Sequence, residues 1–278
     1  MRTIRMHSMK RPSHITASFQ KTIRGYYTRQ GRSFPWRETM DPYAILVSEV
    51  MLQQTQTDRV VSKYAEWIKV FPTVEVLAQA PQRKVLTVWQ GLGYNRRALN
   101  LHRLAQVLVR EYKGIVPRDT ETLESLPGIG PYTAGAIRAF AFDEPGIFLE
   151  TNIRAVYLHF FFGGSVKVSD KELLLRVAET LPRRSIRTWY NALMDYGAML
   201  KRTKKSFCDQ SIHYTKQTRF RGSRRELRGE IIRQASKKKN ISPKDFKIRN
   251  SEERIQSVFS DLVREGFLKQ KSNTYTLI

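Results

Sequence analysis

The apolar residues of this chain recur with a period near 3.6 from Ile15 to Leu200, and this restricts the fold more than any other feature. The period-two alternation of half-buried strands is nearly absent over the same stretch. "DPYAILVSEVMLQQTQ" (41–56) begins with an Asp-Pro cap signal and continues as an apolar helix. Similar helical patterns occur in "TVEVLAQA", "QRKVLTVWQGLG", "RRALNLHRLAQVLVREYKG", "SDKELLLRVAETLP" and "IRTWYNALMDYGAMLKR". The sequence therefore predicts a mainly α, all-helical body.

Length, apolar runs and cysteine content limit the number of domains, the membrane association and the compartment that we expect. At 278 residues the chain can form one large domain plus a small one, or two lobes. No apolar run reaches the ~18 residues that a membrane span needs, so we expect no membrane partner. Residues 1–14 form a basic tail without the apolar region of a signal peptide. The single Cys208 excludes an internal disulfide and suits a reducing compartment, so we expect a cytoplasmic protein, nucleoid-associated if prokaryotic.

A strong excess of positive charge favours a polyanionic partner. The formal net charge is +24, and 21 Lys and Arg against 8 Asp and Glu lie from Lys201 to Ile278. Nucleic acid fits this excess better than an acidic membrane, because no basic amphipathic anchor is visible. A basic surface that serves only solubility is the alternative.

The C-terminal residues differ from the rest. Residues 206–222 resemble a basic, irregular connector, and 223–278 contain three helical patterns followed by "FLKQKSNTYTLI", which alternates about a Ser-Asn turn as a hairpin does. Three helices followed by a hairpin predict a small winged-helix-like DNA-binding domain. A helical cap without a role on DNA is the alternative.

"LPGIGPYTAGAI" (126–137) is the most specific stretch. Gly128 and Gly130 lie two apart between helical patterns, which permits a tight hairpin with outward-facing backbone N–H groups. A helix begins directly after it, so a phosphate can bind there without contact to any base. A plain interhelical turn would also explain two glycines.

This stretch resembles the helix-hairpin-helix of the endonuclease III superfamily of DNA glycosylases. "PWR", "SEVMLQQTQ", "FPTVEVLAQA" and "VWQGLGYNRRALNLH" are similar to its MutY-type branch, the A/G-specific adenine glycosylases. The similarity extends from about Phe34 to Lys205 and implies a two-lobed glycosylase domain at 15–205. It also implies double-stranded DNA with a mispaired or damaged base as partner, flipping of the base, and base excision repair by a monomer. The implied substrate is adenine opposite 8-oxoguanine or guanine.

Release of adenine requires protonation of the leaving base and negative charge near the oxocarbenium sugar. By the resemblance, Glu49 is the general acid, Glu150 stabilises the sugar cation, and Asn152 orients Glu150. The family has an aspartate where this chain has Glu150, which moves the carboxylate by about 1.5 Å. The alternatives are an exposed helical glutamate for Glu49, and a helix cap or a partner of Arg154 for Glu150.

Further roles follow from the same resemblance. Tyr132 stands where bifunctional relatives have a lysine, and a tyrosine cannot form the Schiff base for strand cleavage, so we expect a monofunctional enzyme. Gln54 matches the wedge that fills the gap of the flipped base, and Asn95 replaces a second, aromatic wedge. The base pocket is assigned to Trp36, Arg37 and Leu52. Contacts to DNA are assigned to Gln53, Gln54, Gly128, Ile129, Gly130, Tyr132, Thr133, Lys201, Arg202, Lys204 and Lys205.

The family's iron–sulfur cluster is bound by four cysteines, and the corresponding places here are Lys201, Cys208, Ser211 and Gln217. One thiolate cannot hold a four-iron cluster, so we expect no cluster and no metal. The resemblance allows a monovalent cation at the hairpin. The branch's C-terminal domain that reads 8-oxoguanine is not recognisable.

Two other functions stay open. The first is removal of another base, such as thymine or uracil opposite guanine, or hypoxanthine. The second is a non-catalytic DNA-binding protein, in which Glu150 marks lost chemistry. "SEVMLQQTQ" favours catalysis, because a binding protein needs neither a buried acid nor a wedge.

Overall fold

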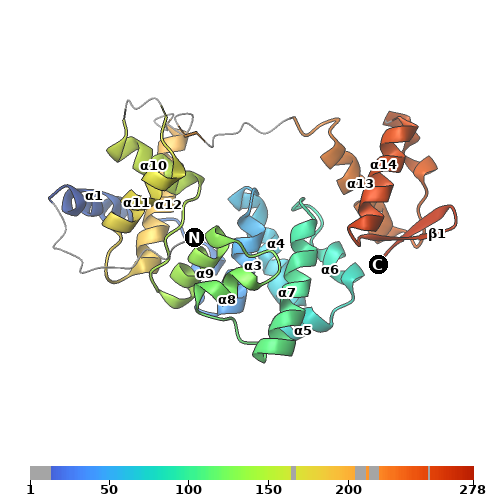
Figure 1. Cartoon of the computed structure of the whole chain (residues 1–278), viewed down its shortest axis with the longest axis horizontal. Helices are drawn as coiled ribbons and strands as arrows, with labels where there is room; N and C mark the ends of the chain where they lie inside the picture. Colours follow the sequence, from blue (N-terminus) through green and yellow to red (C-terminus); the bar gives the residue numbers. More distant parts are fainter. Residues whose placement is uncertain (1–13, 164–166, 204–210, 213–218, 250) are drawn as a thin grey trace. The chain divides into compact units, whose positions relative to one another are not determined.

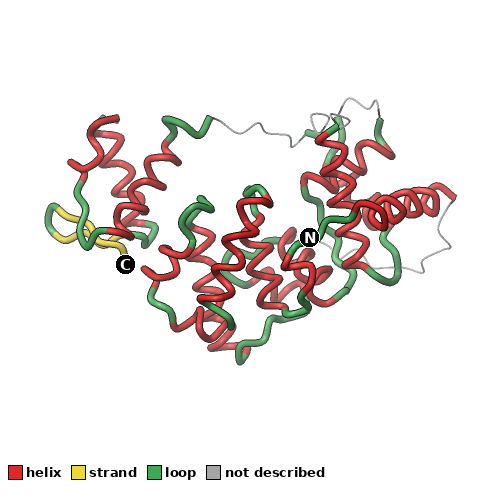
Figure 2. Tube along the Cα trace, turned by 180° about the vertical axis from the view of Figure 1, so that it is seen from behind, coloured by secondary structure: helices red, strands yellow, loops and turns green. Residues whose placement is uncertain are grey.

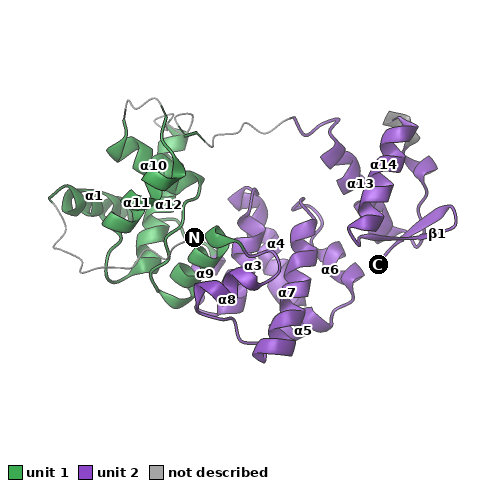
Figure 3. Cartoon of the chain, in the orientation of Figure 1, with its two compact units in different colours: residues 1–34, 130–215 green, residues 35–129, 216–278 purple. Residues whose placement is uncertain are grey.

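The structure, a computed structural model, describes residues 14–163, 167–203, 211–212, 219–249 and 251–278 (Figure 1). The chain divides into two compact units, one formed by residues 1–34 and 130–215 and the other by 35–129 and 216–278 (Figure 3). The predicted helical body is confirmed, and the strand pair of the described residues lies near the C-terminus (Figure 2). Within the described ranges, no helix is long and apolar enough to cross a bilayer.

The helices of unit 1 pack around an aromatic core. Its helices are α1 (His14–Gln30), α9 (Pro131–Phe142), α10 (Thr151–Phe161), α11 (Asp170–Thr180) and α12 (Ile186–Arg202). α10 and α1 pack on α12. The ring of Phe19 from α1 lies edge-on to Tyr157 and to Trp189, with 5.5 Å between centroids in both pairs. Such aromatic pairs add to the free energy of burial, so they fix α1 to the rest of the unit.

A buried carboxylate fastens the chain that leaves α1. Asp195 on α12 is 2% exposed and accepts hydrogen bonds from the backbone N–H and the Nε of Arg32, both at 2.8 Å. The Arg32 guanidinium also lies 2.7 Å from Asp195 Oδ1. A buried charge must be paired in this way, so Asp195 holds the segment after α1 on α12.

Unit 2 contains the remaining helices of the body. They are α2 (Pro35–Glu38), α3 (Pro42–Leu52), α4 (Thr57–Val70), α5 (Val74–Gln79), α6 (Gln82–Val88), α7 (Arg96–Tyr112) and α8 (Thr120–Ser125). Trp67 forms their core centre, with ring centroids 4.8 Å from Phe71 and 5.4 Å from Trp89. The Asp41 cap is confirmed, because its side chain accepts the Tyr43 N–H at 3.0 Å and Pro42 follows at the first helical position.

The expected extent of this helix was wrong at its C-terminal end. The apolar pattern continued to Gln56, but α3 ends at Leu52 and the backbone turns at Gln54, where φ is +54°. A left-handed residue cannot continue an α-helix.

The C-terminal part of unit 2 has the order that the sequence predicts. It consists of α13 (Arg224–Lys237), the short 3-10 helix η2 (Pro243–Arg249), α14 (Glu252–Arg264), β1 (Leu268–Lys271) and β2 (Thr274–Leu277). β1 and β2 pair antiparallel from Leu268 opposite Leu277 to Lys271 opposite Thr274. Ile241 forms a further antiparallel bridge with Tyr275. The second of the three predicted helices is thus a 3-10 turn.

This C-terminal part is attached to α6 and α7 of the same unit. The Gln82 amide donates to the Gly266 carbonyl at 2.8 Å, and the Arg83 guanidinium donates to the Ser236 carbonyl at 3.1 Å. Arg96 and Arg228 both pair with Glu265, at 3.1 and 2.6 Å. These bonds join the C-terminal part to the other helices of unit 2.

Candidate active site and nucleic-acid surface

Glu150 is the N-cap of α10. Its Oε1 accepts hydrogen bonds from the backbone N–H groups of Asn152 at 2.7 Å and Ile153 at 3.0 Å. The first N–H groups of a helix have no partner within the helix, and a capping oxygen satisfies them. The same position carries the positive end of the helix dipole, which favours a negative group. The predicted capping role of Glu150 is therefore present, and it holds the carboxylate in one place.

The other carboxylate oxygen of Glu150 faces Asn152, whose Nδ2 donates to Oε2 at 3.4 Å. This is the contact expected of an orienting partner. Arg154 does not pair with Glu150 but donates to both oxygens of Asp170, at 2.9 and 2.8 Å. The alternative that made Glu150 a partner of Arg154 was wrong.

Opposing effects act on the charge of Glu150. Burial raises the pKa of this carboxyl, while the N–H groups of Ile153 and Asn152 and the positive charge of Lys201 lower the pKa. Lys201 and Arg202 are exposed in the last turn of α12. Of the other predicted contacts and cluster positions of this segment, Lys204, Lys205, Cys208 and Gln217 lie outside the described residues.

Close helix packing places Glu150. A Cβ at Gly197 of α12 would overlap the backbone carbonyl of Asn152, so only glycine lets the start of α10 lie this close to α12. On the other side, the ring of Phe148 stacks on Tyr190 at 4.2 Å and lies edge-on to Tyr132 at 5.6 Å. Tyr132 is thereby brought to the segment that leads into Glu150.

The hairpin has the backbone geometry that its glycines predict. Gly128 has φ of +81°, and a Cβ there would meet the Asn100 side chain. The Ile129 N–H donates to the Leu126 carbonyl at 3.1 Å, and Gly130 is the N-cap of α9. Ile129 and Thr133 are 6% and 3% exposed, so their side chains face the interior and only their backbone can meet a phosphate.

Glu49 lies on α3, where every residue from Tyr43 to Met51 is buried. Its own exposure is 4%. Of the predicted base-pocket residues, Trp36 packs edge-on against Tyr64 at 5.4 Å, and Arg37 and Leu52 are half-buried. The predicted burial of Glu49 is confirmed, and the alternative of an exposed helical glutamate was wrong.

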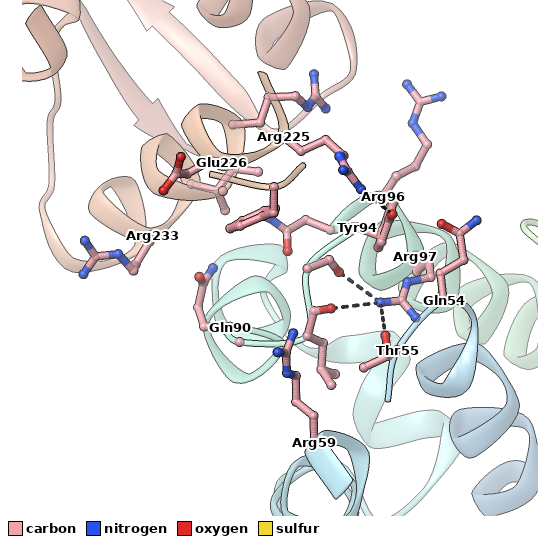
Figure 4. A pocket seen from close by; sticks show the side chains of 18 of the residues that line it. Gln54, Thr55, Arg59, Gln90, Tyr94, Arg96, Arg97, Arg225, Glu226 and Arg233 are labelled. Atoms are coloured by element: carbon pink, nitrogen blue, oxygen red, sulfur yellow. Dashed lines mark hydrogen bonds between the residues drawn. The ribbon is translucent and has the colours of Figure 1, made fainter. Parts of the chain in front are cut away.

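Arg97 ties two loops together and was not foreseen from the sequence. Its guanidinium donates to the Thr55 hydroxyl at 3.0 Å (Figure 4). It also donates to backbone carbonyls at the end of α3 and in the Gly91–Gly93 loop. The carbonyl acceptors are Val50 (2.9 Å), Met51 (2.9 Å), Gln53 (2.6 Å), Leu92 (3.2 Å) and Gly93 (3.1 Å). The guanidinium lies over Trp89, 5.2 Å from the centroid. Burial lowers its pKa to about 10, so it stays charged at neutral pH.

The two loops that Arg97 joins each contain a non-glycine residue in the left-handed region. Gln54 has φ of +54° and is exposed, and Tyr94 has φ of +46° and is 39% exposed. Such conformations cost free energy, persist where surrounding bonds enforce them, and gather at functional sites. The predicted wedge Gln54 is therefore held out to solvent by the bonds of Arg97 to its own loop. Asn95 follows Tyr94 as the N-cap residue of α7.

Comparison with protein families decides the affiliation. A family model described as "HhH-GPD superfamily base excision DNA repair protein" matches residues 47–261, more than half of the chain. The chain belongs to the HhH-GPD superfamily. Among solved structures, that of a thermostable thymine-DNA glycosylase aligns with a TM-score of 0.63 at 30% identity, covering 70% of this chain and 92% of the other. The predicted helical glycosylase fold is confirmed.

Curated relatives carry two base specificities. The chain is 36% identical over 190 residues to an adenine DNA glycosylase of Buchnera aphidicola. This alignment covers 66% of this chain and 53% of the relative. It is 32% identical over 196 residues to a thymine/uracil-DNA glycosylase of Methanothermobacter thermautotrophicus, covering 69% and 88%. The chain thus spans about half the length of the adenine-specific relative.

The metal chemistry of this HhH-GPD chain is limited by its composition. It has one cysteine, and a four-iron cluster needs more thiolates than one. Within the described ranges, no group of three or more His, Cys, Asp or Glu side chains is arranged to hold a metal ion.

The structural roles of two residues of this HhH-GPD chain, Arg97 and Gly197, were not predicted from the sequence. Arg97 sits in "NRRA" beside Arg96, and nothing in the local pattern separates the buried arginine from the exposed one. Gly197 sits in an amphipathic helix, where only its place on the apolar face of α12 hinted at a close helix crossing.

Proposed function

We propose that this chain is a monofunctional DNA glycosylase of base excision repair that acts as a monomer on double-stranded DNA. It would flip a mispaired base out of the duplex and remove it by hydrolysis, with adenine opposite 8-oxoguanine or guanine as the substrate. The family and the identity to adenine DNA glycosylases support this proposal.

The observation that carries the proposal is the buried carboxyl of Glu49 on the helix that ends two residues before Gln54. Glu49 is 4% exposed, and Gln54 is exposed in a left-handed conformation. A proton-donating acid in an apolar place and a side chain held out to fill a gap are what base flipping followed by base release requires. A protein that only binds DNA needs neither.

The chemistry divides between the two carboxyls. The bond between the sugar C1′ and the adenine N9 breaks, its electron pair leaves with the base, and Glu49 donates a proton to the base. The ionised Glu150, oriented by Asn152, stabilises the oxocarbenium cation that remains. Water then adds at C1′ and gives a proton to the solvent, which leaves free adenine and an abasic site. The Tyr132 hydroxyl cannot form a Schiff base, so the strand would stay intact.

Single-turnover base release from synthetic duplexes tests the proposal. Adenine would be placed opposite 8-oxoguanine or guanine, and cleavage by alkali would reveal abasic sites. We expect release by the wild type, release slowed at least about a hundredfold in Glu150→Gln and Glu49→Gln, and no cleavage without alkali. Tight DNA binding by a wild type that releases no base from any duplex would show a non-catalytic binding protein.

Release of thymine or uracil opposite guanine is the second candidate. The observation behind it is the match to a thymine/uracil-DNA glycosylase, of which the chain covers 88%, against 53% to 76% of bacterial adenine-specific relatives. Duplexes with thymine, uracil or hypoxanthine in mispairs belong in the same assay. If one of these bases is released and adenine is not, the proposed substrate changes, but the proposed reaction, hydrolytic removal of a base, still stands.

A further inference from the structure

The arginines and the lysines of the C-terminal part differ in their partners. Arg224 and Arg264 pair with Asp261, and Arg228 pairs with Glu265. In the part of the chain that the structure describes, no carboxylate forms an ion pair with five exposed lysines, which are Lys237, Lys238, Lys239, Lys269 and Lys271. The charges of these lysines are therefore available to an external anion.

The five lysines lie on the two segments that flank β2. Ile241 forms its antiparallel bridge with Tyr275 on one side of β2, and β1 pairs with β2 on the other side (Figure 2). Neighbouring strands are about 4.8 Å apart, so the two flanking segments are about 10 Å apart. Residues 237–242 and 267–278 contain no Asp or Glu. We call these five side chains the lysine edge.

The hairpin directs its two lysines to one face. Lys269 lies opposite Thr276 in the register, and Lys271 lies opposite Thr274. Cross-strand partners project from the same face, and Tyr275 between the two threonines is buried on the other face. The outer face therefore presents ammonium and hydroxyl groups without any carboxylate. Both groups donate hydrogen bonds, and phosphate oxygens accept them.

Helix α6 fixes both segments that carry the lysines. The Arg83 guanidinium donates to the Ser236 carbonyl at 3.1 Å and to the Lys238 carbonyl at 3.2 Å. The Gln82 amide donates to the Gly266 carbonyl at 2.8 Å, two residues before β1. The lysine edge is thus bonded to a helix of the body of unit 2. A surface that is fixed before binding loses less conformational freedom when it binds.

The exposed side of α14 has the opposite character. It consists of Glu252, Glu253, Gln256, Ser257 and Ser260. In a helix-turn-helix, the second helix enters the major groove and its N-terminal residues approach the bases. Here the N-terminal residues of α14 are two carboxylates, which the phosphates on either side of a groove repel. The charge pattern therefore argues against α14 as a helix that reads DNA.

We propose that the lysine edge binds the phosphate backbone of double-stranded DNA, while α14 stays outside the grooves. This contact positions the C-terminal part on the duplex and carries no sequence information. It gives the chain a second hold on DNA, in addition to the glycosylase body. The contact requires neither a mispair nor base removal, so it goes beyond the proposed function.

The salt dependence of binding to undamaged duplexes tests this surface. The double variant Lys269→Gln and Lys271→Gln should lower the slope of log Kd against log salt by about two. Its affinity at physiological salt should fall by about tenfold, equally for duplexes of unrelated sequence. Lys269→Arg with Lys271→Arg should keep the wild-type slope. The matched control, Lys69→Gln with Lys171→Gln, removes the same charge from exposed positions of α4 and α11 and should keep it too.

A wild-type slope in the Lys269 and Lys271 double variant, or an equal fall in the matched control, would overturn the proposal. Loss of binding to anionic phospholipid vesicles with unchanged duplex binding would assign the lysine edge to a membrane instead. Gln256→Ala with Ser260→Ala should leave DNA affinity unchanged, and a sequence-dependent loss would show that α14 reads a groove.

The test is independent of catalysis. Single-turnover base release at saturating enzyme should be the same for the wild type and the Lys269 and Lys271 double variant, because the lysine edge acts on binding alone. A wild type that releases no base but shows the lysine-dependent slope rejects the glycosylase and supports the lysine edge. Base release without that slope does the reverse.

Discussion

The two carboxyls assigned to catalysis lie in contrasting surroundings. Glu49 is 4% exposed on a helix whose residues from Tyr43 to Met51 are all buried. Glu150 caps α10 and receives two backbone N–H groups, and Lys201 adds positive charge. Burial raises the pKa of Glu150, and the N–H donors and the nearby cation oppose this rise. The proposed division of roles needs a proton on Glu49 and a charge on Glu150, and carboxyls in different surroundings can provide both.

The supports of the two carboxyls differ as well. Glu150 is placed by its own backbone and by the crossing of α10 over α12 at Gly197. The segment after Glu49 is placed by Arg97, which binds carbonyls of both loops. One site thus depends on helix packing, and the other depends on a buried cation. Substitutions can separate these two kinds of support.

The largest effect should come from removing each acid without changing its shape. Glu49→Gln cannot donate a proton, and we expect single-turnover base release to fall by about 10²–10⁴. Glu150→Gln keeps a capping oxygen but loses the charge, and a fall of about 10²–10³ is expected.

A series of purines that differ in basicity would distinguish the two roles. The loss in Glu49→Gln should shrink for bases that leave without protonation, and the loss in Glu150→Gln should be the same for all. Equal dependence of both variants on the leaving base would contradict the division of roles.

Arg97→Met should give the next largest effect, on stability and on the loops together. Each buried carbonyl left without its donor costs about 1–3 kcal/mol, so we expect the free energy of unfolding to fall by about 3 kcal/mol or more. Urea titration measures it. Arg96→Met is the matched control, because Arg96 is the next residue and its side chain is 64% exposed, with one ion pair to Glu265. A loss below about 1 kcal/mol is expected there.

An Arg97→Met variant that keeps its fold would also be informative. If Arg97→Met folds, fluorescence of 2-aminopurine at the target position should show weaker base flipping, because Gln54 is no longer held out. Unchanged base flipping and unchanged stability would contradict the role of Arg97 in holding the two loops.

The sequence predicts elements from local signals and misses what depends on distant contacts. The Asp41-Pro42 cap, the glycine hairpin at Gly128 and the C-terminal hairpin each followed from residues close in the chain. The end of α3 did not, because Arg97, more than forty residues later, takes its last carbonyls. Likewise, the resemblance identified Glu150 by position, but only the packing at Gly197 explains how it is held.

Gly197→Ala should have a smaller effect that falls on unit 1. The added methyl would overlap the Asn152 carbonyl, and overpacking of this kind costs about 1–3 kcal/mol. Base release should fall too, since α10 carries Glu150. Gly25→Ala in α1 is the control, because its methyl meets only the Arg29 side chain at 3.5 Å. We expect that control to be stabilised by about 0.5–1 kcal/mol. Equal thermal shifts of the two variants would contradict the close crossing.

The smallest effect concerns pH. In the proposed mechanism Glu150 acts in its ionised form. Burial raises its pKa above the ordinary value of 4.5, so the acidic limb of the rate profile should lie above pH 4.5. Lys201 lowers this pKa, and Lys201→Met should therefore move the limb to higher pH, with unchanged rates on the alkaline side of the limb. Because Lys201 is exposed, the displacement should shrink as salt is added. Arg202→Met, at the next position of the same helix end, should leave the limb in place, so equal displacement by both variants would point to a general loss of positive charge.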